Sequence, residues 1–166
     1  EVGADRAPKA AEDLAKLLEG AGCEIVQLGA VGTPDDAAAG GRKLAESHVD
    51  AIAFATTSWY EDYLAIDLLE YCAAPVLLWP LPGMETGALC GSQQLTCHLK
   101  QLGHPYACVF GPIADDANLH TALAFLRGAA LKQRLRRSRV GIAGHRVEGM
   151  TESAANEIAL KKTIGP

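Results

Sequence analysis

The hydrophobic pattern of this chain switches repeatedly between two periods, and this alternation restricts the folds it can adopt. Short apolar runs, typical of buried strands, alternate with longer stretches whose apolar residues recur at helical spacing. The expected strands cover residues 23–28, 51–56, 76–79, 106–110 and 140–143. The expected helices cover residues 8–21, 33–48, 61–72, 90–102, 116–137 and 151–162, with Thr33, Asp115 or Asp116, and Thr151 at their starts. Regular alternation of this kind predicts a parallel sheet with crossover helices.

The fold class expected is therefore α/β, a doubly wound parallel sheet of the flavodoxin-like type. Its strands are apolar on both faces, as burial between two helical layers requires. The chain opens with a helix, so the sheet lacks its first strand, which would lie centrally. We expect a fragment of a protein that begins earlier. Residues 1–138 would form a first α/β domain, and residues 139–166 the truncated start of a second.

Composition narrows the functional classes. The formal net charge is −5, which argues against a nucleic-acid partner, and the basic residues near position 136 suit a helix C-terminus. No apolar run approaches the roughly 20 residues that span a bilayer, so no membrane partner is expected. The five cysteines fit neither a disulfide framework nor a zinc pattern and are expected to act as small hydrophobes. A reducing, cytoplasmic location is the simplest interpretation.

Polar residues follow the expected strands, at the sheet edge where open parallel sheets bind ligands. An indole can pack on the C–H surface of a sugar, and side-chain amides can bond its hydroxyls. Turns are polar in any protein, so this clustering alone leaves a structural role open. Gly29-x-x-Gly32 is not a dinucleotide fingerprint, and the chain has no phosphate loop. Irregular spacing makes core packing the favoured role for Cys90, Cys97, His98, His104 and Cys108, ahead of a metal site.

Three segments resemble the N-terminal region of the L-fucose and L-arabinose isomerase superfamily. They read FATTSWYEDYLAIDLLE, PVLLWPLPGMETGALCGSQQLTCHLKQLGHPYACVFG and RVGIAGHRVEGMTESAANEIALKKTIG. The resemblance implies an aldose–ketose isomerase that works through an ene-diol with Mn²⁺ or another divalent metal. It places the metal ligands beyond Pro166, and none within this chain. It further implies a homo-oligomer, a trimer or hexamer, in which this domain completes the sugar pocket of a neighbouring subunit.

Site residues are carried over from the superfamily by position. Trp59 resembles the tryptophan that packs on the sugar, and Gln93, or Gln94 in a register shifted by one, resembles a substrate-binding glutamine. His145 and Met150 bound a loop that resembles a pocket-lining segment. The chain departs from the superfamily pattern at two places. Ser92 replaces an asparagine, and the segment 85–87 has no counterpart. The substrate can therefore differ from both fucose and arabinose. Glu85 is expected either at the pocket rim or as a solvated loop acid.

Two other functions stay open from the sequence. The first is a sugar-binding or regulatory α/β module without catalysis, and the second is an independent domain that binds a phosphorylated cofactor. Because the implied metal ligands lie outside this chain, we expect residues 1–166 alone to have no isomerase activity.

Overall fold

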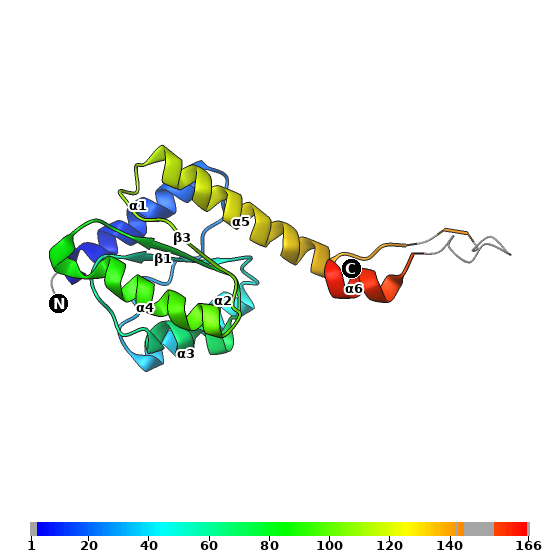
Figure 1. The fold of residues 1–166 in the computed structure, drawn as a ribbon, viewed down its shortest axis with the longest axis horizontal. Coiled ribbons are helices and arrows are strands. Elements are labelled where there is room, and N and C mark those ends of the chain that lie inside the picture. The colour runs from blue at the N-terminus through cyan, green and yellow to red at the C-terminus, as the bar shows by residue number, and fades with distance from the viewer. Residues whose placement is uncertain (1–2, 142, 145–154, 166) are drawn as a thin grey trace.

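The computed structural model describes residues 3–141, 143–144 and 155–165. Its centre is a parallel three-stranded sheet in the order β1-β2-β3 (Figure 1). The strands are β1 (Ile52–Thr56), β2 (Val76–Pro80) and β3 (Tyr106–Cys108). Ile52 pairs with Val76, and Val76 pairs with Tyr106. The expected parallel α/β sheet is therefore confirmed.

Helices cover both faces of the sheet (Figure 1). One face carries α1 (Ala7–Gly20) and α5 (Asp116–Arg137), which pack on Leu77 and Trp79 of β2. The other face carries α2 (Pro34–Glu46), α3 (Tyr63–Tyr71) and α4 (Ala88–Gln101), which pack on Val76 and Leu78. The short elements are η1 (Ala4–Arg6), η2 (Met84–Thr86) and α6 (Glu157–Thr163). Among the described residues, no helix is long and apolar enough to cross a membrane.

Two helix starts follow the local sequence closely. The Thr33 hydroxyl accepts the Asp36 amide, and the Asp36 carboxylate accepts the Thr33 amide, which forms a reciprocal capping box at α2. The Asp36 carboxyl has a lowered pKa, because it accepts hydrogen bonds from the Thr33 side chain and from backbone amides. Asp115 caps α5 by accepting the amides of Ala117 and Asn118.

Three of the expected strands differ in the structure. Residues 23–28 form no strand, although Ile25 and Val26 are half-buried against the helices. The third observed strand ends at Cys108, before position 110. The described residues of segment 140–143 are also outside any strand, and Val140 is 76% exposed. Residues 23–28 and the described residues of 140–143 pair with no strand in the described part of the chain, and a strand requires such a neighbour. Beyond Cys108 the regular strand ends, although the Val109 amide still donates to the Leu78 carbonyl oxygen.

The C-terminal part begins its helix later than expected. The Thr151 cap lies outside the described residues. α6 starts at Glu157, and the Asn156 side chain caps it by accepting the Ala159 amide. α5 carries the chain away from the sheet toward this helix (Figure 1).

A close approach between α2 and α3 supplies a stability test. A Cβ on Gly41 would lie 2.5 Å from the Leu68 carbonyl oxygen and 2.8 Å from Cβ of Tyr71. We expect Gly41→Ala to lower the free energy of unfolding by about 1–3 kcal/mol, because the helices must move apart. Urea unfolding measures this change.

The matched control is Gly128→Ala in α5, where a Cβ would meet nothing within 4 Å. There the better helix propensity of alanine should raise stability by up to about 1 kcal/mol. Equal effects of the two substitutions would contradict the close packing of α2 on α3.

Candidate functional site

The carboxyl edge of the sheet holds two loops that are tied together. Residues 57–62 follow β1, and residues 81–87 follow β2. The Trp59 amide donates to the Thr86 carbonyl oxygen at 2.6 Å, and the Leu81 amide donates to the Thr56 carbonyl oxygen at 2.9 Å. The two loops therefore form one surface above the ends of the strands, the place where parallel sheets bind ligands.

Trp59 presents its indole from this surface. Trp59 is 40% exposed, while its backbone amide is bonded to Thr86. A Cβ on Gly87 would lie 3.1 Å from Cβ of Trp59, and Gly87 has a φ of +69°. Glycine is required there for both reasons, since the loop approaches closely and takes a left-handed conformation. The backbone of Trp59 is thus held in place, while its indole ring is exposed to solvent.

Glu85 belongs to the short helix η2, directly before the Thr86 that bonds to Trp59, and is exposed. The loop beneath it is held by Thr86, whose buried hydroxyl donates to the Gly83 carbonyl oxygen at 2.6 Å. Arg6 approaches the same loop and donates from Nη2 to the Pro82 carbonyl oxygen at 3.2 Å. This edge therefore carries the exposed acids Glu61 and Glu85 and the exposed guanidinium of Arg6.

The two glutamines lie further along α4. Gln93 and Gln94 are both exposed, more than one turn after the helix starts at Ala88. Their neighbours Ser92 and Leu95 point inward and are fully buried. The structure thus brings Trp59 and Glu85 onto one surface, whereas the glutamines occupy the solvent side of α4. His145 and Met150 lie outside the described residues.

A buried polar cluster was missed by the sequence analysis. The hydroxyls of Thr56 and Ser92 form a buried hydrogen bond of 2.9 Å that joins β1 to α4. The Tyr60 ring packs against Gly91, and the Tyr60 hydroxyl is buried without a hydrogen-bond partner among the described residues. Ser92 sits three and seven residues before the buried Leu95 and Leu99, so its place on the apolar stripe of α4 was the available signal.

Burial raises the pKa of Tyr60 to about 12, although the nearby Ser92 hydroxyl acts in the opposite direction. The cause is desolvation, which disfavours the phenolate. Tyr60 is therefore a neutral group at physiological pH and can only donate or accept as a phenol.

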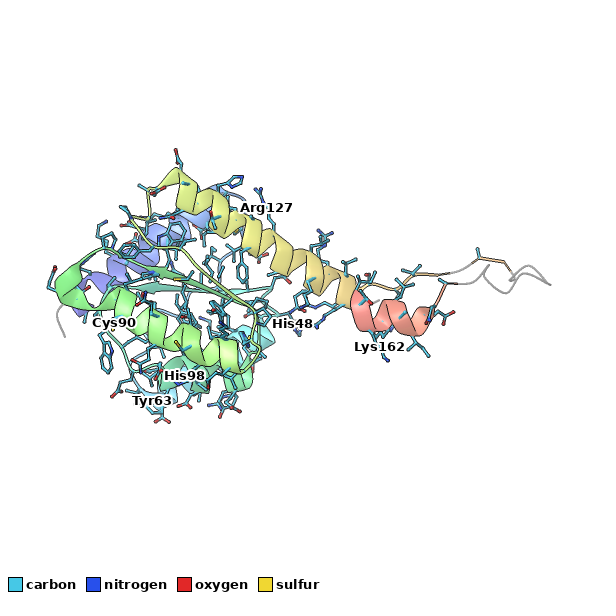
Figure 2. All side chains as sticks on the ribbon, in the orientation of Figure 1. His48, Tyr63, Cys90, His98, Arg127 and Lys162 are labelled. Carbon is cyan, nitrogen blue, oxygen red and sulfur yellow. The ribbon has the colours of Figure 1, made fainter. Side chains whose placement is uncertain are left out.

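A second polar pair bridges α3 and α4. His98 Nδ1 lies 2.7 Å from Oδ2 of Asp62, and about half of the His98 side chain is exposed. Figure 2 shows His98 on α4 together with Cys90 near the start of that helix. The expectation that His98 packs in the core is wrong, because Asp62 holds it at the surface.

The cysteines also depart from expectation. All five thiols are free, but Cys90, Cys97 and Cys108 are exposed, and only Cys72 is buried. Cys90 and Cys97 take outward positions of α4, which apolar composition alone did not reveal. Within the described part of the chain, no group of three or more His, Cys, Asp or Glu side chains is placed to hold a metal ion.

Comparisons with known proteins give one distant similarity. Over 123 residues, or 70% of this chain, the sequence is 25% identical to sulfoquinovose isomerases of Priestia aryabhattai and Priestia megaterium (strain ATCC 12872 / QMB1551). The match covers 28% of the length of each relative, so it aligns with well under half of those proteins. No family model matches the chain.

The hydroxyl pair yields a test of the junction between β1 and α4. We expect Thr56→Val to cost about 1–3 kcal/mol of unfolding free energy, because it leaves the Ser92 hydroxyl buried without its partner. The double variant with Ser92→Ala should cost less than the sum of the two single changes.

Urea unfolding of all four proteins measures the coupling. Thr96→Val is the control, since the Thr96 hydroxyl bonds within its own helix turn at the surface and should change stability by no more than about 0.5 kcal/mol. Additive single changes would contradict a direct Thr56–Ser92 bond.

The shifted pKa of Tyr60 predicts a pH dependence. A tyrosine whose folded pKa is about 12, above its ordinary value of 10.0, adds stability below pH 10 that is lost as pH rises toward 12. Tyr60→Phe should make the fall in stability between pH 10 and 12 shallower and should remove the highest step in the phenolate absorbance titration. Tyr60 ionising with the other tyrosines would contradict its burial.

Proposed function

We propose that this chain is the N-terminal part of a sugar isomerase that interconverts an aldose and a ketose. The observation that carries the proposal is the 25% identity with sulfoquinovose isomerases over 70% of the chain. The parallel α/β fold and the surface of Trp59 and Glu85 at its carboxyl edge are consistent with it. Ketol isomerisation through an ene-diol is the reaction class that we assign to the whole protein.

The residues of this chain would bind and orient the sugar. The exposed indole face of Trp59 offers an apolar surface for sugar C–H groups. Glu85 accepts hydrogen bonds from hydroxyls, while Gln93 and Gln94 can both donate and accept them. On α4, the glutamines face away from this chain's own sheet, which supports a rim that closes over the pocket of a neighbouring subunit in a homo-oligomer.

The substrate class that we propose is a reducing monosaccharide. L-Fucose and L-arabinose are candidate substrates because of the sequence resemblance, and sulfoquinovose is a candidate because the relatives are named for it. Arg6 places a positive charge beside the loop of Glu85, which gives a sulfonated sugar a partner that a neutral sugar does not need. A substrate panel should therefore include both neutral and anionic sugars.

We place the divalent metal, with Mn²⁺ as the first choice, outside this part of the chain. The described residues offer no cluster that fits a metal. A bound divalent ion would stabilise the charge that develops on the sugar oxygens. Trp59 and Glu85 would fix the position of the sugar, and residues 1–166 alone would not turn it over.

Substitution of Trp59 tests the proposal in the natural polypeptide that contains this chain. We expect Trp59→Ala to lower kcat/KM by about tenfold, mainly through KM, because a stacked aromatic contributes about 1.4 kcal/mol to sugar binding. Trp59→Phe should recover part of the loss. Steady-state kinetics with Mn²⁺ and the sugar panel provide the measurement.

Tyr71→Ala is the matched control, since Tyr71 is an exposed aromatic residue at the C-terminal end of α3, whereas the loop of Trp59 precedes the N-terminal end. Gln93→Ala can be compared in the same way with Gln101→Ala at the end of α4. If the natural polypeptide binds the sugar but does not turn it over, the proposed function changes from an enzyme to a sugar-binding module. Unchanged kinetics in Trp59→Ala would remove Trp59 from the pocket.

A further inference from the structure

The solvent side of α4 carries almost no charge. Of the 14 residues in this helix, only Lys100 is a lysine, arginine, aspartate or glutamate. The outer side of α1 is ordinary by comparison, since it exposes Lys9, Glu12, Lys16 and Glu19. The core of a protein–protein interface is depleted of charged residues relative to the rest of a protein surface. The outer side of α4 therefore has the composition of a contact surface.

The uncharged residues form one stripe along the helix. Cys90, Gln94 and Cys97 are exposed and follow one another at intervals of four and three residues, so they project from the same side. Gln93 is exposed beside them, whereas Leu95 on the other side of the helix is fully buried. Figure 2 labels Cys90 close to the start of α4. These four exposed residues are called the α4 stripe below.

Two copies of the α4 stripe are complementary in charge when the helices run antiparallel. Glu85 lies shortly before the helix and Lys100 lies near its end, and both are exposed. An antiparallel pair brings each Glu85 near the partner's Lys100, whereas a parallel pair would bring like charges together. The helix dipoles also favour the antiparallel arrangement, because each positive end then lies beside a negative end. A second copy of this chain, related by a two-fold axis, is thus the occupant that the stripe fits.

The stripe also fixes where the two-fold axis passes. Cys90 and Cys97 are the outermost members of the stripe, so an axis between Gln93 and Gln94 sets Cys90 of one copy level with Cys97 of the other. Packed helices have axes 8–10 Å apart and Cα atoms about 2.3 Å from each axis. Opposing Cα atoms then lie roughly 3.5–5.5 Å apart, which is close enough for direct side-chain contact. In the same register, the partner's Lys100 lies level with Gly87.

We propose that α4 forms a two-fold contact between two copies of this chain, with the helices antiparallel and the axis between Gln93 and Gln94. Each copy then contributes Lys100 to the neighbour's candidate site. It arrives beside Gly87, whose backbone lies against Trp59 and follows Glu85 closely in the chain. There its ammonium pairs with the Glu85 carboxylate. Only this role of Lys100 rests on the proposed function, and the contact itself does not depend on the sugar.

Helix geometry makes the two cysteines a selective probe of this contact. Both thiols are free and exposed. Within one chain, the rise of the helix separates the Cα atoms of Cys90 and Cys97 by about 10 Å. A disulfide requires Cα atoms within about 7 Å of each other. A disulfide between Cys90 and Cys97 can therefore form only between two chains.

Oxidative cross-linking of the natural polypeptide that contains this chain tests the proposal. The protein is oxidised with copper–phenanthroline and digested with chymotrypsin, which separates Cys90 from Cys97 by cleavage after Leu95. Mass spectrometry then compares the Cys90–Cys97 disulfide with the Cys90–Cys90 and Cys97–Cys97 disulfides. We expect the mixed pair to exceed each like pair by about tenfold or more, because like cysteines lie about 10 Å apart along the paired helices.

The exposed thiol of Cys108 lies on β3, away from the stripe, so Cys108→Ser is the matched control and should leave this yield unchanged. A statistical mixture of the three disulfides, or none between Cys90 and Cys97, would overturn the proposal. Because the readout is a disulfide and not turnover, it stays separate from any failure of the isomerase assignment.

Charge reversal tests the register. Lys100→Glu should lower the rate of Cys90–Cys97 cross-linking by about threefold or more, because it sets two carboxylates against each other. Adding Glu85→Lys restores opposite charges and should recover the rate. Lys132→Glu on α5 is the control, since Lys132 is exposed on another helix, and it should have no effect. If the double variant cross-links as slowly as Lys100→Glu alone, the partner's Lys100 does not reach Glu85 and the proposed register is wrong.

Discussion

The structure depends on the burial of β2 between two layers of helices. All five residues of this strand are buried, and it pairs with β1 on one side and β3 on the other. Val76 and Leu78 face the core under α2, α3 and α4, whereas Leu77 and Trp79 face α1 and α5. The Trp79 indole N–H donates to the Gly111 carbonyl oxygen, which satisfies its polar group inside the core. Each helical layer is thus positioned by alternate side chains of one strand.

The two loops of the candidate site are held in place by their connection to β2. Backbone bonds continue past the strand ends, from Leu81 to Thr56 and from Trp59 to Thr86, so both loops leave the sheet in a defined register. The Thr56–Ser92 bond ties the start of α4 to the same edge. Binding side chains on loops that a rigid scaffold positions are a common arrangement in α/β proteins. Here the buried groups supply position, and the exposed indole and carboxylate supply contact.

The sequence predicted that Trp59 and Glu85 follow strand ends, but it did not predict which side of α4 faces the sheet. Trp59 and Glu85 were placed at the carboxyl edge because the ends of parallel strands can be read from apolar runs. That Gln93 and Gln94 face solvent, with Ser92 inward, depends on which side of α4 meets the sheet. Residue type pointed to the side-chain amides of Gln93 and Gln94 as the functional groups of this helical turn. It did not indicate that Ser92 would be buried. The pairing of Asp62 with His98 joins two helices and had no local signal.

The helices and their caps were determined by the sequence itself. Hydrogen bonds of a helix join residues four apart, and the caps at Thr33 and Asp115 act within three residues, so local sequence is sufficient. Strands differ because their hydrogen bonds are made to distant segments. Residues 52–56 and 76–80 form strands because they pair with each other, whereas residues 23–28, which include Glu24 and Gln27, pair with no strand among the described residues. Only the tertiary structure could decide which apolar runs are strands, because pairing is a property of two segments and never of one.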